Sequence, residues 1–216
     1  MPSRCIHLRR PAVLQVQEGV FVPQGNVLDE VDRRWSVLCE SNPAYFDGRA
    51  YNVLGVNRNG CGGAIVHVIE CAYRFYAVQD EEFDLQVRGL GVKGFTMRDN
   101  RALLGRRSRN VGVYPDLWEF APGGVVEPGK SPAEVIVSEL SEETNLTTQC
   151  EPTPIAIVSD PTARTWELIY LITDLHGEAQ TTPEYSQLRW CARNELPDDL
   201  SPIAQSMIPL WPTSQD

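Results

Sequence analysis

The chain has 216 residues, a formal net charge of -10 and 42% hydrophobic residues. This composition is typical of a folded globular protein, and its acidic balance argues against a nucleic acid polymer as partner. No apolar stretch approaches the ~20 residues that a membrane-spanning helix requires, and the Arg9-Arg10 pair interrupts any secretory signal core. We therefore expect a cytoplasmic protein without a membrane partner, built as one compact unit or as a core domain with a smaller flank.

Cysteines and basic residues narrow the chemistry only slightly. The six cysteines form no C-x-x-C pair, which argues against a zinc site or a redox dithiol. Between Arg88 and Arg109, seven basic residues accompany a single acid, Asp99. Such a stretch is compatible with a small anionic ligand and equally with a solvated hairpin face.

Residues 1–86 are expected to form an α+β flank. A helix should follow Asn26 and end at Asn42-Pro43, because apolar residues recur at 3-4-3 spacing on one of its faces, namely Leu28, Val31, Trp35 and Leu38. The pattern then predicts strands at Tyr51–Val56, Ala64–Ile69 and Tyr73–Val78. The residues of this flank suggest no reaction by themselves.

Residues 87–216 are expected to form a second unit. Its predicted strands are Gly91–Met97, Ala102–Arg107, Trp118–Phe120, Ile155–Ser159, Trp166–Thr173 and Gln187–Cys191, and its predicted helices are Pro132–Thr144 and one that begins near Ser201. The segment from Gly89 to Gly94 matches the G-x-G-x-x-G pattern, but a dinucleotide-binding loop must open a helix. Here the chain continues as a strand, so we reject a nucleotide-binding loop at this position.

The Pro132–Thr144 helix has a signal at each end. Ser131 and Glu134 form a capping-box pattern around Pro132, and Asn145 fits a left-handed cap at the carboxyl end. One face of the helix is apolar and is expected to pack against a sheet through Ala133, Ile136, Val137 and Leu140.

Three acids, Glu139, Glu142 and Glu143, occupy a neighbouring face of this helix at i, i+3 and i+4. Like charges at this spacing repel each other, and a hard divalent cation such as Mg²⁺ would turn the repulsion into attraction. A solvated acidic face is the alternative, which the acids alone would favour. The preceding loop changes the balance, because Gly123 and Gly124 expose backbone carbonyls that can bind a metal and amides that can approach phosphate.

The segment from Gly124 to Leu146 resembles the Nudix box, G-x5-E-x7-R-E-U-x-E-E-x-G-U, in which U is a bulky aliphatic residue. Six positions match at the required spacing, namely Gly124, Glu139, Leu140, Glu142, Glu143 and Leu146. The resemblance covers roughly residues 87–211. It implies an α+β protein with the Nudix fold, a mixed β-sheet sandwiched between α-helices, over residues 87–216 and with the α+β flank before it.

Three positions of the box differ from the family pattern. Lys130 replaces the first Glu, Ser138 replaces the Arg, and Asn145 replaces the Gly. In the family that Glu and that Arg contact each other, and the Arg also helps to hold the Glu at the position of Glu139. The orientation of Glu139 is therefore less secure here, and we expect activity that can be slow.

The resemblance also implies the site. The carbonyl of Gly123 and the carboxylates of Glu139, Glu142 and Glu143 would bind Mg²⁺, with Mn²⁺ as an alternative. Glu184 is the main candidate for a further catalytic carboxylate, and Glu167, inside a strand, is the weaker one. Arg106 and Arg107 would pair with phosphate oxygens. Tyr114 and Trp118 would stack on the base, although Trp118 fits a core position better.

The implied reaction is hydrolysis of a nucleoside diphosphate linked to another group, X. The flank, with Trp35, the 42–48 segment and Ala72–Phe75, is diffusely similar to the one in UDP-glucose pyrophosphatase-like Nudix members. This similarity favours a nucleotide sugar of the UDP-sugar or ADP-ribose type as the small-molecule partner, and a homodimer is left open. The rivals are a binding-only Nudix module with a degenerate box and a nucleophile hydrolase, for which no G-x-S-x-G is present.

Overall fold

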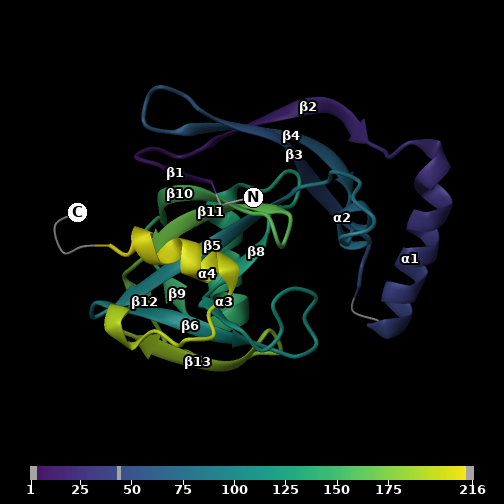
Figure 1. Ribbon diagram of the computed structural model, residues 1–216. Coiled ribbons are helices and arrows are strands. Elements are labelled where there is room, and N and C mark those ends of the chain that lie inside the picture. Colours follow the sequence, from purple (N-terminus) through teal and green to yellow (C-terminus); the bar gives the residue numbers. More distant parts are fainter. Residues whose placement is uncertain (1–3, 43–44, 213–216) are drawn as a thin grey trace.

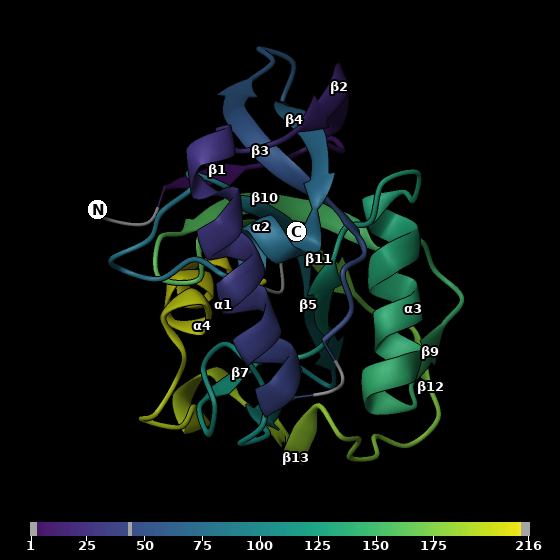
Figure 2. The ribbon, with the colours of Figure 1, turned by 90° about the vertical axis from the view of Figure 1, so that its right-hand side faces the viewer.

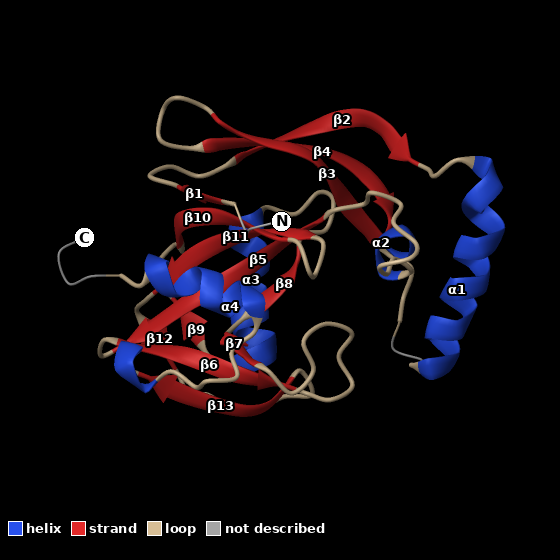
Figure 3. Ribbon diagram, in the orientation of Figure 1, coloured by secondary structure: helices blue, strands red, loops and turns tan. Residues whose placement is uncertain are grey.

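The computed structural model of the chain describes residues 4–42 and 45–212. Within these ranges, eleven strands form one mixed sheet (Figures 1 and 3). Its main path runs in the order β1 (Cys5–His7), β10 (Thr153–Asp160), β11 (Thr165–Ile172), β5 (Gly89–Arg98), β3 (Arg49–Arg58), β4 (Ala64–Ala72) and β2 (Val13–Phe21). Four more strands branch from this path, namely β6 (Arg101–Arg107), β7 (Trp118–Phe120), β8 (Gly123–Val125) and β13 (Tyr185–Cys191).

Helices cover both faces of the central strands. Figure 2 shows α3 (Pro132–Thr144) and α4 (Pro202–Met207) on opposite sides of β5. Helix α3 packs with Leu90 and Val92 of β5 in one core cluster, and α4 packs with Phe95 of the same strand in another. Successive residues of a strand point to opposite faces, so both helices are anchored on one strand. The expected mixed sheet sandwiched between helices is confirmed.

The ends of α3 are those that the sequence predicts. Ser131 Oγ accepts from the Glu134 amide at 3.3 Å, and the Glu134 carboxylate accepts from the Ser131 amide at 3.1 Å. Asn145 ends the helix with a φ of 60°, in the left-handed region that Asn tolerates.

The buried face of α3 is rotated from the predicted one. Ile136 and Leu140 are fully buried as expected, but Val137 is 36% exposed, whereas Val135 is only 5% exposed. Consecutive helical residues lie about 100° apart, so the two neighbours of Ile136 lie on opposite flanks of the buried stripe. The sheet covers the flank that carries Val135, and the prediction for Val137 is wrong.

Residues Tyr73–Val78 do not form the predicted strand. The segment is a short helix, α2 (Tyr73–Ala77), directly after β4. Its aromatic residues favour a strand on propensity alone, but Asp47, distant in sequence, accepts a hydrogen bond from the Arg74 amide at 2.9 Å. That contact satisfies a free amide of the first helical turn, and no local pattern announces it.

The flank shares the sheet with the rest of the chain. Helix α1 (Leu28–Ser41) forms as predicted and lies beside α2 at the edge of the molecule (Figure 1), although Pro43 lies outside the described residues. Strand β1 pairs with β10, and β3 meets β5 at Asn52 and Gly89. The domain boundary near residue 87 stays a prediction. No helix in the part of the chain that the structure describes is long and apolar enough to cross a membrane.

We predict that Leu140→Ala lowers the free energy of unfolding by about 2–5 kcal/mol, because it leaves a cavity under a fully buried side chain. The matched change Val137→Ala, on the exposed edge of the same helix, should shift it by no more than about 0.5 kcal/mol. Urea denaturation measures both. Equal losses would contradict the observed orientation of α3.

Candidate functional site

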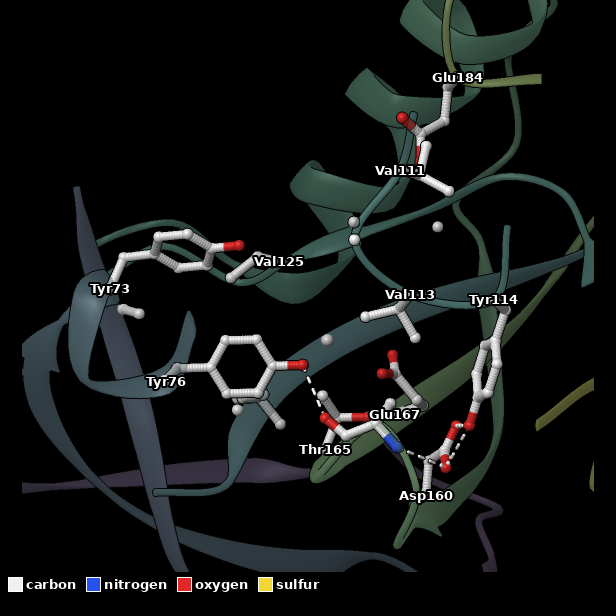
Figure 4. A pocket seen from close by; sticks show the side chains of 18 of the residues that line it. Tyr73, Tyr76, Val111, Val113, Tyr114, Val125, Asp160, Thr165, Glu167 and Glu184 are labelled. Atoms are coloured by element: carbon white, nitrogen blue, oxygen red, sulfur yellow. Dashed lines mark hydrogen bonds between the residues drawn. The ribbon is translucent and has the colours of Figure 1, made fainter. Parts of the chain in front are cut away.

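A cavity of about 540 Å³ lies where the flank meets the central sheet. Its walls come from distant parts of the sequence, as Figure 4 shows. The flank contributes the tyrosines 45, 73 and 76. The loop between β6 and β7 contributes residues 110–114, and the Gly-Gly loop contributes Gly123 and Gly124. The cavity therefore joins the predicted catalytic loop to a segment for which the sequence suggested no chemistry.

The floor of the cavity is one face of β5 and β11. Gly89, Gly91 and Lys93 lie on the face of β5 that also carries Phe95, which packs under α4. Helix α4 covers only the Phe95 end of this face. The Gly89 end stays uncovered because its small residues place nothing above the backbone, and this absence of side chains creates the cavity.

The acids of α3 contact the Gly-Gly loop directly. Glu143 is buried and accepts a hydrogen bond from the Gly123 amide at 2.9 Å. Glu139 lies against Gly124 so closely that a Cβ atom at position 124 would be 2.1 Å from Glu139 Oε1. Only glycine fits at position 124 without displacing this carboxylate. Glu142, one turn from Glu139, is exposed.

Crowding and burial perturb two of these carboxyls. Burial, followed by the charges of Glu142 and Glu184, raises the pKa of Glu139 to about 7. Burial also raises the pKa of Glu143 to about 8, although the hydrogen bond from the Gly123 amide acts in the opposite direction. Without a cation, each carboxyl is thus harder to ionise than a free glutamate.

The donor chemistry of this region fits a hard divalent cation. Its donors are carboxylate and carbonyl oxygens, which Mg²⁺ and Mn²⁺ prefer, and a cation would offset the charges that raise the pKa values of Glu139 and Glu143. In the arrangement seen here, no three His, Cys, Asp or Glu side chains within the described ranges are gathered tightly enough to hold a metal. Coordination by several acids would therefore require side-chain rotation.

A buried ion network forms the side of the cavity next to the Gly-Gly loop. Glu119 accepts from Lys93 Nζ at 2.8 Å and from Arg107 Nη1 at 3.0 Å. Arg107 Nη1 also contacts Glu184 Oε1 at 2.6 Å. Burial would raise the pKa of Glu119, but Lys93 and Arg107 lower it overall, so its carboxylate stays ionised. Lys93 Nζ lies against Gly123, which places this buried cation beside the predicted catalytic loop.

The sequence missed two members of this network. Lys93 stands in the rejected glycine pattern, and Glu119 stands in the short Trp-Glu-Phe strand. The available signal was a charged residue inside an otherwise apolar strand, which burial makes costly unless it is paired. That signal marks an ion pair but does not name the partner.

The predicted substrate-binding residues divide into two groups. Arg107 and Tyr114 line the cavity, and the Tyr114 hydroxyl donates to Asp160 at 2.8 Å. Arg106 does not line it, because neighbouring residues of a strand face opposite sides, and its guanidinium contacts the Asp116 carbonyl and Asp199. Trp118 is buried in the core under α4. The structure thus corrects the predicted contacts of Arg106 and Trp118 and leaves Arg107 and Tyr114 as candidates.

The predicted acids also differ in their positions. Glu184 lines the cavity, and its side chain is 34% exposed. Glu139 and Glu143 reach the cavity only through the backbone of Gly124 and Gly123, which line it. Lys130, one of the departures from the box pattern, forms an ion pair with Glu127 at 2.7 Å. Two of the acids predicted to bind the metal, Glu139 and Glu143, therefore meet at the Gly-Gly loop, at one end of the cavity.

Residues 87–211 match the family model described as the NUDIX domain. The chain belongs to this family. It is 32% identical over 120 residues to the CTP pyrophosphohydrolase of Escherichia coli (strain K12), and the matched region covers 55% of this chain and 85% of that protein. It is 28% identical over 113 residues to an ADP-ribose pyrophosphatase of Methanocaldococcus jannaschii, and the matched region covers 50% of this chain and 64% of that protein.

A solved MutT NUDIX hydrolase from Burkholderia pseudomallei has the same fold. It superposes with a TM-score of 0.51 at 23% identity, over 56% of this chain and 95% of that chain. Together with the family match, these similarities make the chain a Nudix-type pyrophosphohydrolase.

The raised pKa of Glu143 predicts a pH-dependent cost to stability. In the folded protein the carboxyl loses its proton near pH 8, against 4.5 for the ordinary group. Ionisation of this carboxyl therefore favours the unfolded state. The resulting loss in the free energy of unfolding grows as pH rises above 4.5 and is complete above pH 8. In metal-free buffer, Glu143→Gln should raise Tm little at pH 5 and by several degrees, roughly 3–10 °C, at pH 8.5.

Glu142→Gln is the matched control for this measurement, because the Glu142 side chain is exposed on the same helix. Its Tm difference from wild type should not grow by more than about 1 °C between the two pH values. Thermal melts in EDTA measure both variants. A Glu143→Gln difference that stays constant with pH would contradict the assigned environment.

Proposed function

We propose that the chain hydrolyses the diphosphate of a nucleoside diphosphate linked to a sugar, in a reaction that depends on Mg²⁺ or Mn²⁺. The observation that carries this proposal is one continuous cavity. At one end lie the Gly-Gly loop and the cations Lys93 and Arg107, and farther away lie the aromatic residues of the flank. A diphosphate with an organic group on each side fits such a division of charge.

The cationic end of the cavity is where the diphosphate would bind. Lys93 and Arg107 are held by Glu119 and cannot swing away, so their charges are in place before the substrate arrives. The amides of the Gly-Gly loop lie at the same end and can donate to phosphate oxygens. Arg107 would use its remaining guanidinium donors, since a carboxylate contact leaves part of its fork free.

Glu139, Glu142, Glu143 and the carbonyl of Gly123 would hold the divalent cation. When bound, the cation supplies charge neutralisation and lowers the pKa of the attacking water. Glu184 contacts Arg107 at the edge of the cavity and is the candidate for accepting the proton of that water. Its partial exposure leaves it within reach of solvent, as a proton acceptor requires.

Two observations bear on the substrate. One relative named above is called an ADP-ribose pyrophosphatase, and the other a CTP pyrophosphohydrolase. The flank of this chain adds Tyr45, Tyr73 and Tyr76 to the cavity wall, and tyrosine rings can stack on a base or on a sugar ring. Room for a group beyond the diphosphate favours a nucleotide sugar over a nucleoside triphosphate.

A binding module without catalysis is the second candidate. Lys130 and Ser138 remove the pair that supports Glu139 in the family, and Lys130 is instead paired with Glu127. This contact braces the loop before α3 but leaves Glu139 without the family's arginine. A binding module would retain affinity for nucleotide sugars and release no product.

A panel of UDP-sugars, ADP-ribose and CTP, incubated with Mg²⁺ or Mn²⁺, tests the reaction by the release of nucleoside monophosphate. We expect the largest kcat/KM for a nucleotide sugar. Glu142→Gln and Glu143→Gln should each lower kcat by at least about 100-fold, because each removes a metal-binding oxygen charge. Circular dichroism should remain that of the wild type.

Glu178→Gln serves as the control, because it removes an exposed carboxylate that does not line the cavity. Its turnover should equal that of the wild type. Near-wild-type turnover in both α3 variants would overturn the metal assignment. Binding of a nucleotide sugar without any product would establish the binding module instead.

A further inference from the structure

The glycine pattern rejected as a nucleotide loop has a different consequence in the fold. Gly89 and Gly91 lie on β5 directly beside Thr165 and Glu167 of the parallel strand β11. A Cβ atom at position 91 would be 2.2 Å from Glu167 Oε2, and one at position 89 would be 3.3 Å from Thr165 Cγ2. The two glycines let the β11 side chains lean across the floor of the cavity.

Glu167 is a buried carboxyl, and the nearby charge of Lys93 offsets the effect of its burial only in part. Glu167 is 7% exposed and forms no ion pair with any residue that the structure describes. The nearest cation, Lys93, is paired with Glu119. The Thr165 hydroxyl lies against the carboxyl and favours its ionised form, although its buried oxygen has no hydrogen-bond partner of standard geometry. Burial raises the pKa of Glu167, as expected for a carboxyl in this environment.

Asp160, in the same region, is a buried acid whose carboxylate is fully hydrogen-bonded by its neighbours. It lies opposite Thr165 on β10, and its carboxylate accepts from the Tyr114 hydroxyl and from the amides of Thr162 and Ala163. Within the described residues, no tyrosine hydroxyl or backbone amide bonds to Glu167 in this way, and the Thr165 hydroxyl lies against it instead. A buried polar group left unpaired costs roughly 1–3 kcal/mol, and more when it is charged, so a fold has reason to keep one where a ligand completes it.

Figure 4 shows the carboxyl of Glu167 pointing into the cavity between the rings of Tyr76 and Tyr114, far from Glu184. The Tyr76 hydroxyl donates to the Ala163 carbonyl at 2.7 Å, which fixes that ring as a wall. Thr165 and Glu167 are two residues apart on one face of β11, so their side chains lie next to each other on the floor of the cavity. The site thus offers acceptors on its floor and aromatic faces at its sides.

We propose that Glu167, with Thr165 beside it, binds two adjacent hydroxyls of a sugar ring and selects substrates that carry them. This inference deepens the proposed function. Two adjacent hydroxyls can donate to both carboxylate oxygens at once, and the apolar face of a sugar ring can pack on an aromatic side chain. A phosphate is disfavoured here by the charges of Glu167 and Asp160, so the uncharged part of the ligand belongs at this end.

The hydroxyls can come from the ribose of the nucleoside or from the sugar of group X. Calorimetric titration in metal-free buffer, in which the proposed hydrolysis does not proceed, separates these sources. The ligands are UDP-glucose, its 2′-deoxyribose analogue, UDP without the hexose, and ADP-ribose. Glu167→Met keeps the side-chain volume and removes both acceptors, and Glu178→Met, on the exposed surface, is the matched control.

We expect Glu167→Met to weaken the binding of UDP-glucose or ADP-ribose by about 10–100-fold, which is the usual range for a hydrogen bond to a charged group. If the hydroxyls come from ribose, Glu167→Met should weaken the binding of UDP by the same factor, and it should leave the binding of the deoxyribose analogue unchanged. If the hydroxyls come from the hexose, the substitution should weaken the binding of the deoxyribose analogue by this factor and leave the binding of UDP unchanged. Glu178→Met should bind every ligand as the wild type does.

A second readout distinguishes recognition from a structural role. Glu167→Met should raise Tm in the absence of ligand, because it removes a carboxyl whose burial is offset only in part. Gly91→Ala, whose new Cβ displaces the Glu167 carboxyl without removing it, should reproduce the loss of binding. Unchanged affinity in both variants would overturn the proposal. So would a loss of affinity that is equal for all four ligands, or a wild-type protein that binds none of them. Binding with these hydroxyl preferences but no hydrolysis would instead refute only the proposed reaction.

Discussion

The alternation of side chains along β5 is the constraint on which the rest of the site depends. Leu90 and Val92 hold α3 on one face, and Phe95 holds α4 on the other. Gly89, Gly91 and Lys93 share the face of Phe95 and line the cavity at the end of that face that α4 leaves uncovered. Because the alternation of side chains is fixed by the backbone, one strand sets the positions of α3 and α4 and leaves the floor of the cavity open.

Charge is distributed unevenly along that floor. Near the Gly-Gly loop, Lys93 and Arg107 are locked onto Glu119, which leaves a fixed positive region. Beside Gly91, two residues along β5 from Lys93, Glu167 is buried without an ion-pair partner among the described residues. Charges act more strongly in a partly desolvated cavity than in water, so the proposed ligand, with an anionic centre and a hydroxyl-bearing ring, would favour the orientation that places its anionic centre near Lys93 and Arg107. The flank completes this arrangement through Tyr76, which walls the end that carries Glu167 (Figure 4).

Local signals in the sequence were sufficient where the structure is locally determined. The limits of α3 follow from a capping box and a left-handed Asn, and the structure has both. The turn between β5 and β6 is likewise local, because Asp99 and Asn100 tolerate the positive φ that it requires. The Tyr73–Val78 segment was mispredicted because its helix is capped by Asp47, more than twenty residues earlier. Val137 was misplaced because the period of a helix gives the width of a buried stripe but not its edges.

The sequence by itself determined the family and the limits of α3, and it placed the proposed metal-binding acids on that helix, because all of these lie within one continuous segment with fixed spacing. Only the tertiary structure decided which side chains from other parts of the chain lie next to that segment and line the cavity. The sequence could not tell that Arg107 rather than Arg106 faces the cavity, since the facing side of a strand depends on its register with β7 and β13. Nor could it pair Lys93 with Glu119, or place Glu167 over Gly91, because those contacts join strands that are far apart in sequence and meet only when the sheet has formed.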